Sequence, residues 1–308
     1  MATAPALVSS AGPNAEYAWE EFLGRHARNP HTRRAYTRAV RRFLAWCQSR
    51  DIPLAEVRPL HVADYLDQLS AAPPTKKLHL AALRALFDAL VTRHAVPVNP
   101  AASVRGERHT ALEGKTPEIT ADQARRLLAS IDPGTAVGLR DKCVIAVLVY
   151  TAARAGAVAR LRVKDMVDDG SQQLLRFAEK GGKERLIPVR HDLEELLRAY
   201  QQAAGLADAP ADAPLFRTAA GKGGRLTGNP VTGLDVWRIV KRRLQAAGLP
   251  ARLRPHSFRV LAVTDLLSQN VPLEDVQLLA GHADPRTTRL YDRRQRKVTR
   301  NIVERISV

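Results

Sequence analysis

The sequence predicts a mainly α-helical protein of the α+β class with one small β-sheet and two domains, and three observations support this prediction. Apolar residues recur at helical spacing along most of the 308 residues. Two short apolar runs, residues 174–178 and 185–189, flank a glycine-containing turn as the strands of a β-hairpin do. A polar stretch without periodicity, residues 106–117, is expected to link two domains, the number that this length favours.

The first helical region, residues 14–105, is expected to form a unit of four or five helices behind a flexible N-terminus, residues 1–13. Thr32 is a candidate cap for a helix whose apolar stripe ends at Cys47, and residues 77–91 repeat the helical period. Prolines end the helices at three places, residues 51–53, 72–74 and 96–100.

The second region, residues 118–308, is expected to start with a helix after Thr120, which is followed by the acidic Asp122 in the first turn. Residues 138–149 predict a second, buried helix. After the hairpin, helices are expected over residues 192–203, 231–247, 256–269 and 273–280. Asp284 as cap and Pro285 in the first turn predict the start of a last helix.

The composition indicates a basic protein with a sizeable core. Its 48 Lys and Arg against 31 Asp and Glu give a net charge of +17, which suits a polyanion such as nucleic acid or an anionic membrane surface. The longest apolar stretch, residues 143–153, is far shorter than the roughly 20 residues of a membrane span, and the N-terminus lacks a basic leader. The 2 cysteines, Cys47 and Cys143, cannot form a disulfide framework. We therefore expect a cytoplasmic protein that binds nucleic acid and does not associate with a membrane.

Two groups of basic side chains lie beside predicted turns. Arg154 follows the apolar helical run, where an arginine can also interact simply with the helix dipole. Lys180 and Lys183 lie in the predicted hairpin turn, where a solvated charge is the ordinary alternative. Neither group by itself indicates a particular function.

Two further groups contain histidine. His256 and Arg259 are three residues apart, so a helix places both on one face, where two phosphate-binding donors converge. His282 follows a glycine and precedes Tyr291 by nine residues, with the predicted helix start at Asp284 between them. A histidine at a helix end and a partly buried tyrosine are each common in proteins without such a site. The four groups together, the two basic ones and the two with histidine, are not expected in this order by chance.

The order and spacing of these groups resemble the tyrosine recombinase family, the phage integrases and Xer-like site-specific recombinases, over nearly the whole chain. The matching motifs are Thr-x-x-Arg ending at Arg154, Lys-Gly-Gly-Lys-Glu-Arg beginning at Lys180, His-x-x-Arg ending at Arg259, Leu-Ala-Gly-His ending at His282, and Tyr291. The resemblance implies a C-terminal tyrosine recombinase catalytic domain and, over residues 14–105, a helical SAM-like core-binding domain that binds DNA.

The resemblance also implies a reaction. Tyr291 would attack a DNA phosphodiester and leave a 3′-phosphotyrosyl link and a free 5′-hydroxyl. Arg154 and Arg259 would clamp the non-bridging oxygens, since guanidinium groups suit phosphate geometry. His256 and His282 would add hydrogen bonds to the transition state, and His256 would assist proton removal from Tyr291.

The leaving 5′-oxygen would receive its proton from Lys180, with Lys183 as the rival three residues further along the same turn. The resemblance further implies double-stranded DNA as the substrate, a tetramer on DNA and room for an accessory protein. The basic tail, residues 292–308, carries apolar residues at helical spacing that pack either on their own core or on a neighbouring subunit. No cofactor and no metal are expected, because the hairpin turn lacks the spacing of a Walker loop and no metal-ligand motif is present.

The first motif departs from the family's usual Thr-Gly-Leu-Arg-x-x-Glu. Alanines stand at the Gly, Leu and Glu positions, namely Ala152, Ala153 and Ala157. Val260 also stands where the family often has His. Without the glutamate, Asp165 is a candidate partner to orient Arg154. Two alternatives therefore stay open: a catalytically weak or inactive DNA-binding member of the fold, and a type IB topoisomerase-like or telomere-resolving enzyme.

Overall fold

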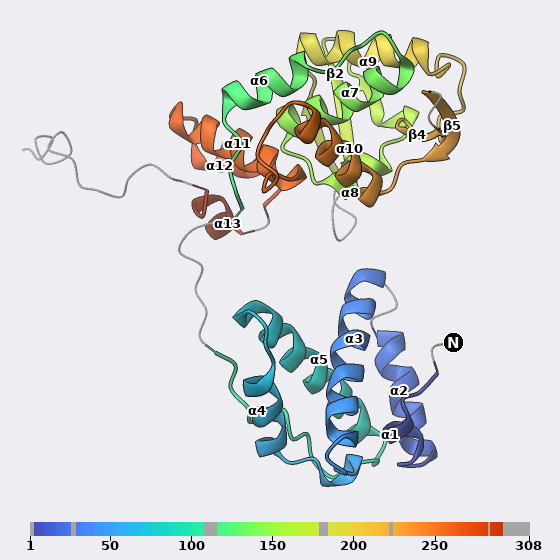
Figure 1. Cartoon of the computed structure of the whole chain (residues 1–308), viewed down its shortest axis with the longest axis vertical. Helices are drawn as coiled ribbons and strands as arrows, with labels where there is room; N and C mark the ends of the chain where they lie inside the picture. The colour runs from blue at the N-terminus through green and yellow to red at the C-terminus, as the bar shows by residue number, and fades with distance from the viewer. Residues whose placement is uncertain are drawn as a thin grey trace, which may run out of the picture. The chain divides into compact units, whose positions relative to one another are not determined.

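The computed structural model describes residues 3–25, 29–107, 116–178, 184–221, 224–282 and 284–291. The chain divides into two compact units, residues 1–110 and 111–308, and the boundary falls within the stretch that we expected to be a linker (Figure 1). Helices dominate both units, and two small antiparallel sheets lie in the second, so the predicted α+β class is confirmed. None of the described helices is long and apolar enough to cross a membrane.

The N-terminal unit is a bundle in which α2 and α3 both pack on α5 (Figure 1). Its helices are α1 (Ala6–Ser9), α2 (Pro13–Arg25), α3 (Pro30–Gln48), the 3-10 turn η1 (Leu54–Glu56), α4 (Pro59–Gln68) and α5 (Pro73–Thr92). Fully buried aromatic rings from three helices fill the core: Trp19, Phe22, Phe43 and Phe87. Aromatic side chains bury large apolar areas, so they account for much of the stability of so small a unit.

Two details of this unit differ from our expectations. Residues 6–9, in the segment expected to be flexible, form α1, and Val8 is fully buried in the core. The cap of α3 is Asn29 and not Thr32: the Asn29 side-chain oxygen accepts the backbone N–H groups of His31 and Thr32 at 3.1 and 3.3 Å. Proline suits the first helical position, so Pro30 starts the helix two residues before Thr32.

The second unit surrounds one buried helix, α7, which packs on α6, α9, α10 and α11. Its helices are α6 (Ala121–Ala129), α7 (Ala136–Thr151), α8 (Ala155–Arg160), the 3-10 turn η2 (Val163–Asp165), α9 (His191–Ala203), α10 (Gly233–Ala246), α11 (Pro255–Ser268), α12 (Leu273–Ala280) and α13 (Pro285–Arg289). Cys143 on α7 and Cys47 on α3 are free and buried. Because α7 has no exposed residue, it forms the core on which the elements of the site are built.

The predicted hairpin is present as β2 (Gln173–Ala178) and β3 (Glu184–Pro188), and β1 (Met166–Asp168) extends it to three antiparallel strands in the order β1-β2-β3. Leu175 pairs with Ile187 in the register of β2 and β3. A second hairpin, β4 (Arg217–Ala220) and β5 (Arg225–Pro230), was not predicted. Its strands are too polar to show an alternating pattern.

Candidate active site

The Tyr291 side chain lies against two histidines. It follows α13, is 8% exposed, and its hydroxyl is 2.9 Å from Nε2 of His256. The rings of Tyr291 and His282 stack with centroids 5.5 Å apart and planes 12° from parallel. Thr264 on α11 donates its hydroxyl to the Tyr291 backbone carbonyl at 3.3 Å. These contacts join α11, the end of α12 and the segment that follows α13.

His256 lies in the first turn of α11 and is half-buried. Burial, together with the positive charges of Arg259, Arg154 and Arg254, lowers the pKa of His256. The imidazole is therefore neutral near pH 7. In the tautomer that carries its proton on Nδ1, Nε2 accepts the hydrogen of the Tyr291 hydroxyl, which is the geometry that a general base needs.

Arg259 lies one turn further along α11 and is 1% exposed. Its Nη1 donates to the backbone carbonyl of Ala152 at 2.7 Å. Its buried Nε and Nη2 atoms make no hydrogen bond with any residue that the structure describes. Burial and the nearby charge of Arg154 lower the pKa of Arg259 to about 10, while the adjacent Tyr291 hydroxyl opposes this shift. The guanidinium thus stays charged at pH 7 and keeps two donors for an anion.

Arg154 lies at the start of α8 and is exposed. The turn before it is unusual, because Ala152 adopts a left-handed conformation with φ of 52° that glycine adopts without a steric penalty. The Ala152 carbonyl that Arg259 binds belongs to this turn, so the bond helps to hold the strained conformation. Ala157 on α8 is buried in the core. The carboxylate of Asp165, our candidate partner for Arg154, accepts the backbone N–H of Arg162 at 2.8 Å and caps η2.

His282 is positioned by the end of α12. Gly281 takes a left-handed conformation with φ of 63° and ends the helix. His282 is 7% exposed, and its Nδ1 lies 2.8 Å from the hydroxyl of Thr288 on α13. Burial and then the charges of Arg259 and Arg154 lower the pKa of His282 to about 3. The ring is neutral across the physiological range and offers one N–H donor.

The structure thus brings five of the six predicted site residues together: Arg154, His256, Arg259, His282 and Tyr291. Lys180 and its rival Lys183 lie outside the described residues. The sequence argument missed two residues beside the site: Thr288, which contacts His282, and Arg185, whose charge acts on Arg259 and His282. Thr288 gives no sequence signal, whereas Arg185 is the last residue of the quoted Lys-Gly-Gly-Lys-Glu-Arg motif.

The site has the electrostatics of an anion-binding pocket. The positive charges of Arg154 and Arg259 lower the pKa of both imidazoles, His256 and His282, and the charge of Arg154 also lowers the pKa of Arg259. A phosphate group would bind the free donors of Arg259 and offset this positive charge. Within the described ranges, no group of three or more His, Cys, Asp or Glu side chains could hold a metal ion.

The depressed pKa of His282 predicts that the protein loses stability as the pH falls from 6.5 toward about 3. In this window the unfolded chain binds a proton at His282 that the folded protein does not, so the free energy of unfolding falls by up to about 1.4 kcal/mol per pH unit. Urea unfolding at several pH values should show this slope, and His282→Gln should flatten it. Equal slopes for the two proteins would contradict the assignment.

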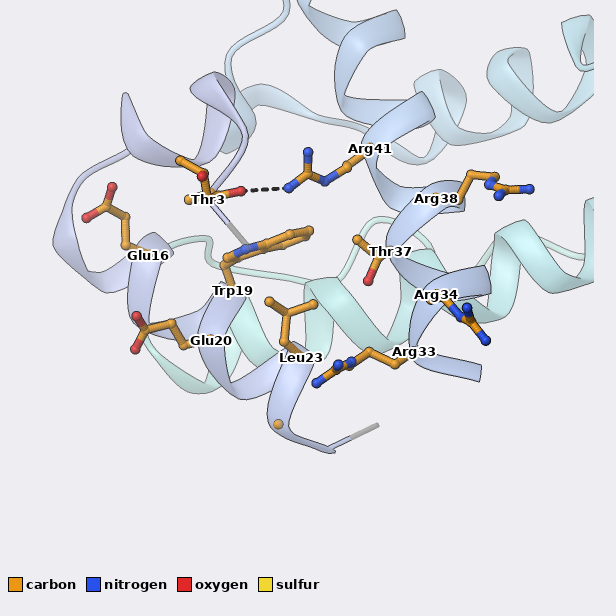
Figure 2. A pocket seen from close by; sticks show the side chains of 12 residues that line it. Thr3, Glu16, Trp19, Glu20, Leu23, Arg33, Arg34, Thr37, Arg38 and Arg41 are labelled. Carbon is orange, nitrogen blue, oxygen red and sulfur yellow. Dashed lines mark hydrogen bonds between the residues drawn. The ribbon is translucent and has the colours of Figure 1, made fainter. Parts of the chain in front are cut away.

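The N-terminal unit carries a second charged feature. A groove of about 1070 Å³ lies between α2 and α3, with Glu16 and Glu20 along α2 and Trp19 in its middle (Figure 2). The Arg41 guanidinium donates to the Thr3 carbonyl at 2.7 Å beside it. Helix α3 exposes five arginines, which we name the α3 arginine stripe: Arg33, Arg34, Arg38, Arg41 and Arg42. A row of guanidinium groups at helical spacing suits the phosphates of a nucleic acid.

Comparisons with known proteins agree with this fold. Residues 117–297 match the model of the phage integrase family, and residues 18–94 match that of the phage integrase N-terminal SAM-like domain. The chain therefore belongs to the phage integrase family of tyrosine recombinases. Members of this family carry out site-specific DNA recombination, and this chain belongs to that class of proteins.

Similar relatives include the tyrosine recombinase XerD of Ralstonia nicotianae, 28% identical over 83% of this chain and 82% of the relative. Another is the tyrosine recombinase XerC of Pelobacter propionicus, 29% identical over 85% of this chain and 84% of the relative.

Two solved structures share the fold. One is the XerH site-specific recombinase bound to difH substrate in a pre-cleavage complex, with a TM-score of 0.66 and 21% identity over 88% of this chain and 77% of that one. The other is a lambda integrase tetramer bound to a Holliday junction, with a TM-score of 0.64 and 18% identity over 97% of this chain and 85% of that one.

Proposed function

We propose that this protein is a site-specific DNA recombinase that cleaves and rejoins DNA through a 3′-phosphotyrosyl intermediate on Tyr291. The observation that carries the proposal is the placement of the Tyr291 hydroxyl, 2.9 Å from the His256 imidazole. The second support is the buried Arg259 guanidinium nearby, which keeps two donors available. A nucleophile beside a base, with cationic donors around it, is the arrangement that phosphoryl transfer requires.

In the proposed cleavage step, the Tyr291 oxygen attacks the phosphorus and the bond from phosphorus to the 5′-oxygen breaks. The neutral His256 takes the phenolic proton. The leaving 5′-oxygen takes a proton from Lys180, a role that stays a prediction because this lysine lies outside the described residues. The reverse attack by a 5′-hydroxyl restores the phosphodiester. The ester conserves the bond energy, so rejoining needs no nucleotide hydrolysis.

The remaining side chains would stabilise the charge that grows on the phosphoryl oxygens. Arg259 offers its Nε and Nη2 edge, and the exposed Arg154 approaches from the start of α8. His282, held by Thr288, is a fixed neutral donor. Such donors are effective because their orientation is set before the reaction, and Arg259 and His282 are buried.

Double-stranded DNA is the proposed substrate, with the α3 arginine stripe contacting phosphates. The solved lambda integrase tetramer on a Holliday junction supports a tetramer on DNA as the active form, and an accessory protein would fit the same class. We place the protein in the cytoplasm, associated with the nucleoid when bound to DNA. Integration, excision and resolution are the outcomes open to this chemistry.

A catalytically weak or inactive DNA-binding protein is the second candidate. The observation that favours it is Ala157, which is buried where the family usually has a glutamate to orient the arginine. A type IB topoisomerase-like enzyme would use the same chemistry on one strand.

Covalent trapping tests these candidates. The purified protein is incubated with nicked duplexes from the DNA beside its own gene and with a pool of randomised nicked duplexes, and denaturing gels resolve adducts. A 3′-phosphotyrosyl link retains the label of the 5′-end of the cleaved strand on the protein and releases the 3′-end label. No adduct, with salt-dependent binding intact, would favour the inactive binder. Plasmid relaxation without exchange between two sites would favour the topoisomerase.

A further inference from the structure

Arg185 on β3 connects three parts of the second unit through one buried guanidinium. It is 9% exposed and lies over the Phe177 ring of β2, with its guanidinium carbon 5.2 Å from the ring centroid. Its Nη1 donates to the backbone carbonyl of Thr151 at 3.2 Å and to the carbonyl of Leu279. The three parts are the β2–β3 hairpin, the end of α7 and the end of α12.

Both carbonyls belong to helix ends that lead directly into the site. Thr151 is the last residue of α7 and precedes Arg154 by three positions. Leu279 lies in the last turn of α12 and precedes His282 by three positions. The last carbonyls of a helix have no partner within the helix and carry partial negative charge, so a buried cation satisfies them and fixes where each helix ends.

A second guanidinium supports the same turn. Arg259 binds the carbonyl of Ala152, the residue after Thr151, at 2.7 Å. The strained left-handed turn before Arg154 is thus held by two arginines on neighbouring carbonyls, one from α11 and one from β3. Arg259 also faces the phosphate position, whereas the hydrogen bonds of Arg185 described above go to backbone. The charge of Arg185 further contributes to the lowered pKa of His282.

We propose that Arg185 is a positioning residue, which sets the Arg154 turn and the His282 turn at the separation that phosphate binding around Tyr291 requires. The inference rests on the proposed function of this site. A purely structural role for Arg185 is the competing explanation. Such a role would change the fraction of folded protein and not the rate of the folded enzyme.

Three variants separate these explanations. Arg185→Met keeps the bulk of the side chain against Phe177 but removes the donors and the charge. Arg185→Lys keeps the charge on a single point donor, which cannot reproduce a planar guanidinium between two carbonyls. Arg176→Met on the neighbouring strand is the matched control, because Arg176 is partly exposed and pairs with Glu184 at a nitrogen-to-oxygen distance of 3.8 Å.

The measurement is the single-turnover rate of adduct formation at saturating nicked duplex, corrected for the folded fraction found by urea unfolding. Arg185→Met is expected to lower this rate by about 10²-fold, the effect of a displacement of about 1 Å in a reacting pair. DNA affinity should change less than about threefold, and Arg176→Met should react like the unaltered protein. Arg185→Lys should recover part of the lost rate. A folded Arg185→Met protein with an unaltered rate would overturn the proposal.

A second readout does not depend on DNA cleavage. The His282 imidazole can be titrated by NMR in the unaltered protein and in Arg185→Lys and Arg185→Met. Its pKa should rise in Arg185→Met and stay low in Arg185→Lys, and an unchanged His282 titration in all three would overturn the proposal. If the unaltered protein forms no adduct but the titrations differ as expected, the proposed function fails while the electrostatic contact of Arg185 with His282 stands. If Arg185→Met does not fold, the adduct rate of Arg185→Lys carries the test: it should lie below that of the unaltered protein, and an unaltered rate in the folded Arg185→Lys protein would overturn the proposal.

Discussion

Tyr291→Phe is expected to abolish the covalent protein–DNA adduct and to leave folding and DNA affinity nearly unchanged. The substitution removes one oxygen atom, so no group remains at this position to attack phosphorus, and the rate should fall by about 10⁴-fold or more. The phenyl ring still stacks on His282, because that contact uses the ring and not the hydroxyl. The hydrogen bond to His256 is lost, a change worth about 1 kcal/mol.

The control for this prediction is Tyr150→Phe in the same unit. Tyr150 is half-buried on α7, and its ring packs under the Arg190 guanidinium at 4.6 Å from the centroid. It has no place in the proposed reaction, so adduct formation should persist. An adduct of unaltered yield with Tyr291→Phe would remove Tyr291 as the nucleophile. Loss of the adduct in both variants would point to a general disturbance of the unit.

Long periodic helices could be predicted from the sequence, and short elements could not. Helix α5 presents the apolar stripe that the spacing over residues 77–91 predicted, because a pattern sustained over several turns is hard to produce by accident. Helix α8 has six residues, and β1 has three. Segments of that length form because neighbouring elements provide their hydrogen-bond partners, so their own residues carry little information.

The local part of the site follows from spacing, and the rest depends on tertiary packing. His256 and Arg259 share a face of α11 because they are three residues apart. The contact between His256 and Tyr291 joins residues 35 positions apart, and order along the chain does not show it. The Thr288 contact to His282 likewise arises only when α13 folds against the end of α12. Lys180 stays a prediction.

The second large effect is expected on stability, at Asp141. This aspartate on α7 is fully buried and accepts hydrogen bonds from three arginines. Arg140 binds Oδ1 at 2.7 Å, while Arg242 and Arg243 on α10 each bind Oδ2 at 2.7 Å. Arg140 also donates to the Arg217 carbonyl on β4 at 2.9 Å. One carboxylate therefore joins α7, α10 and, through Arg140, the second hairpin.

Asp141→Ala should lower the free energy of unfolding by about 3–5 kcal/mol, because it leaves Arg140 buried without its counter-charge and beside two further cations. Urea unfolding measures the loss. The control is Asp122→Ala, whose ion pair with Arg125 is exposed and should contribute about 0–1 kcal/mol. A loss below about 1 kcal/mol for Asp141→Ala would contradict the prediction.

The origin of that loss can be tested directly. If the cost comes from an unpaired buried cation rather than from missing attraction, removing the cation as well should reduce it. Arg140 is the cation to remove, since its side chain is 4% exposed, whereas that of Arg242 is 57% exposed and regains water. The double variant Asp141→Ala, Arg140→Met should therefore be more stable than Asp141→Ala alone. If the double variant instead loses the sum of the stabilities lost by the two single variants, Asp141 acts mainly through α10, where Arg242 and Arg243 bind it.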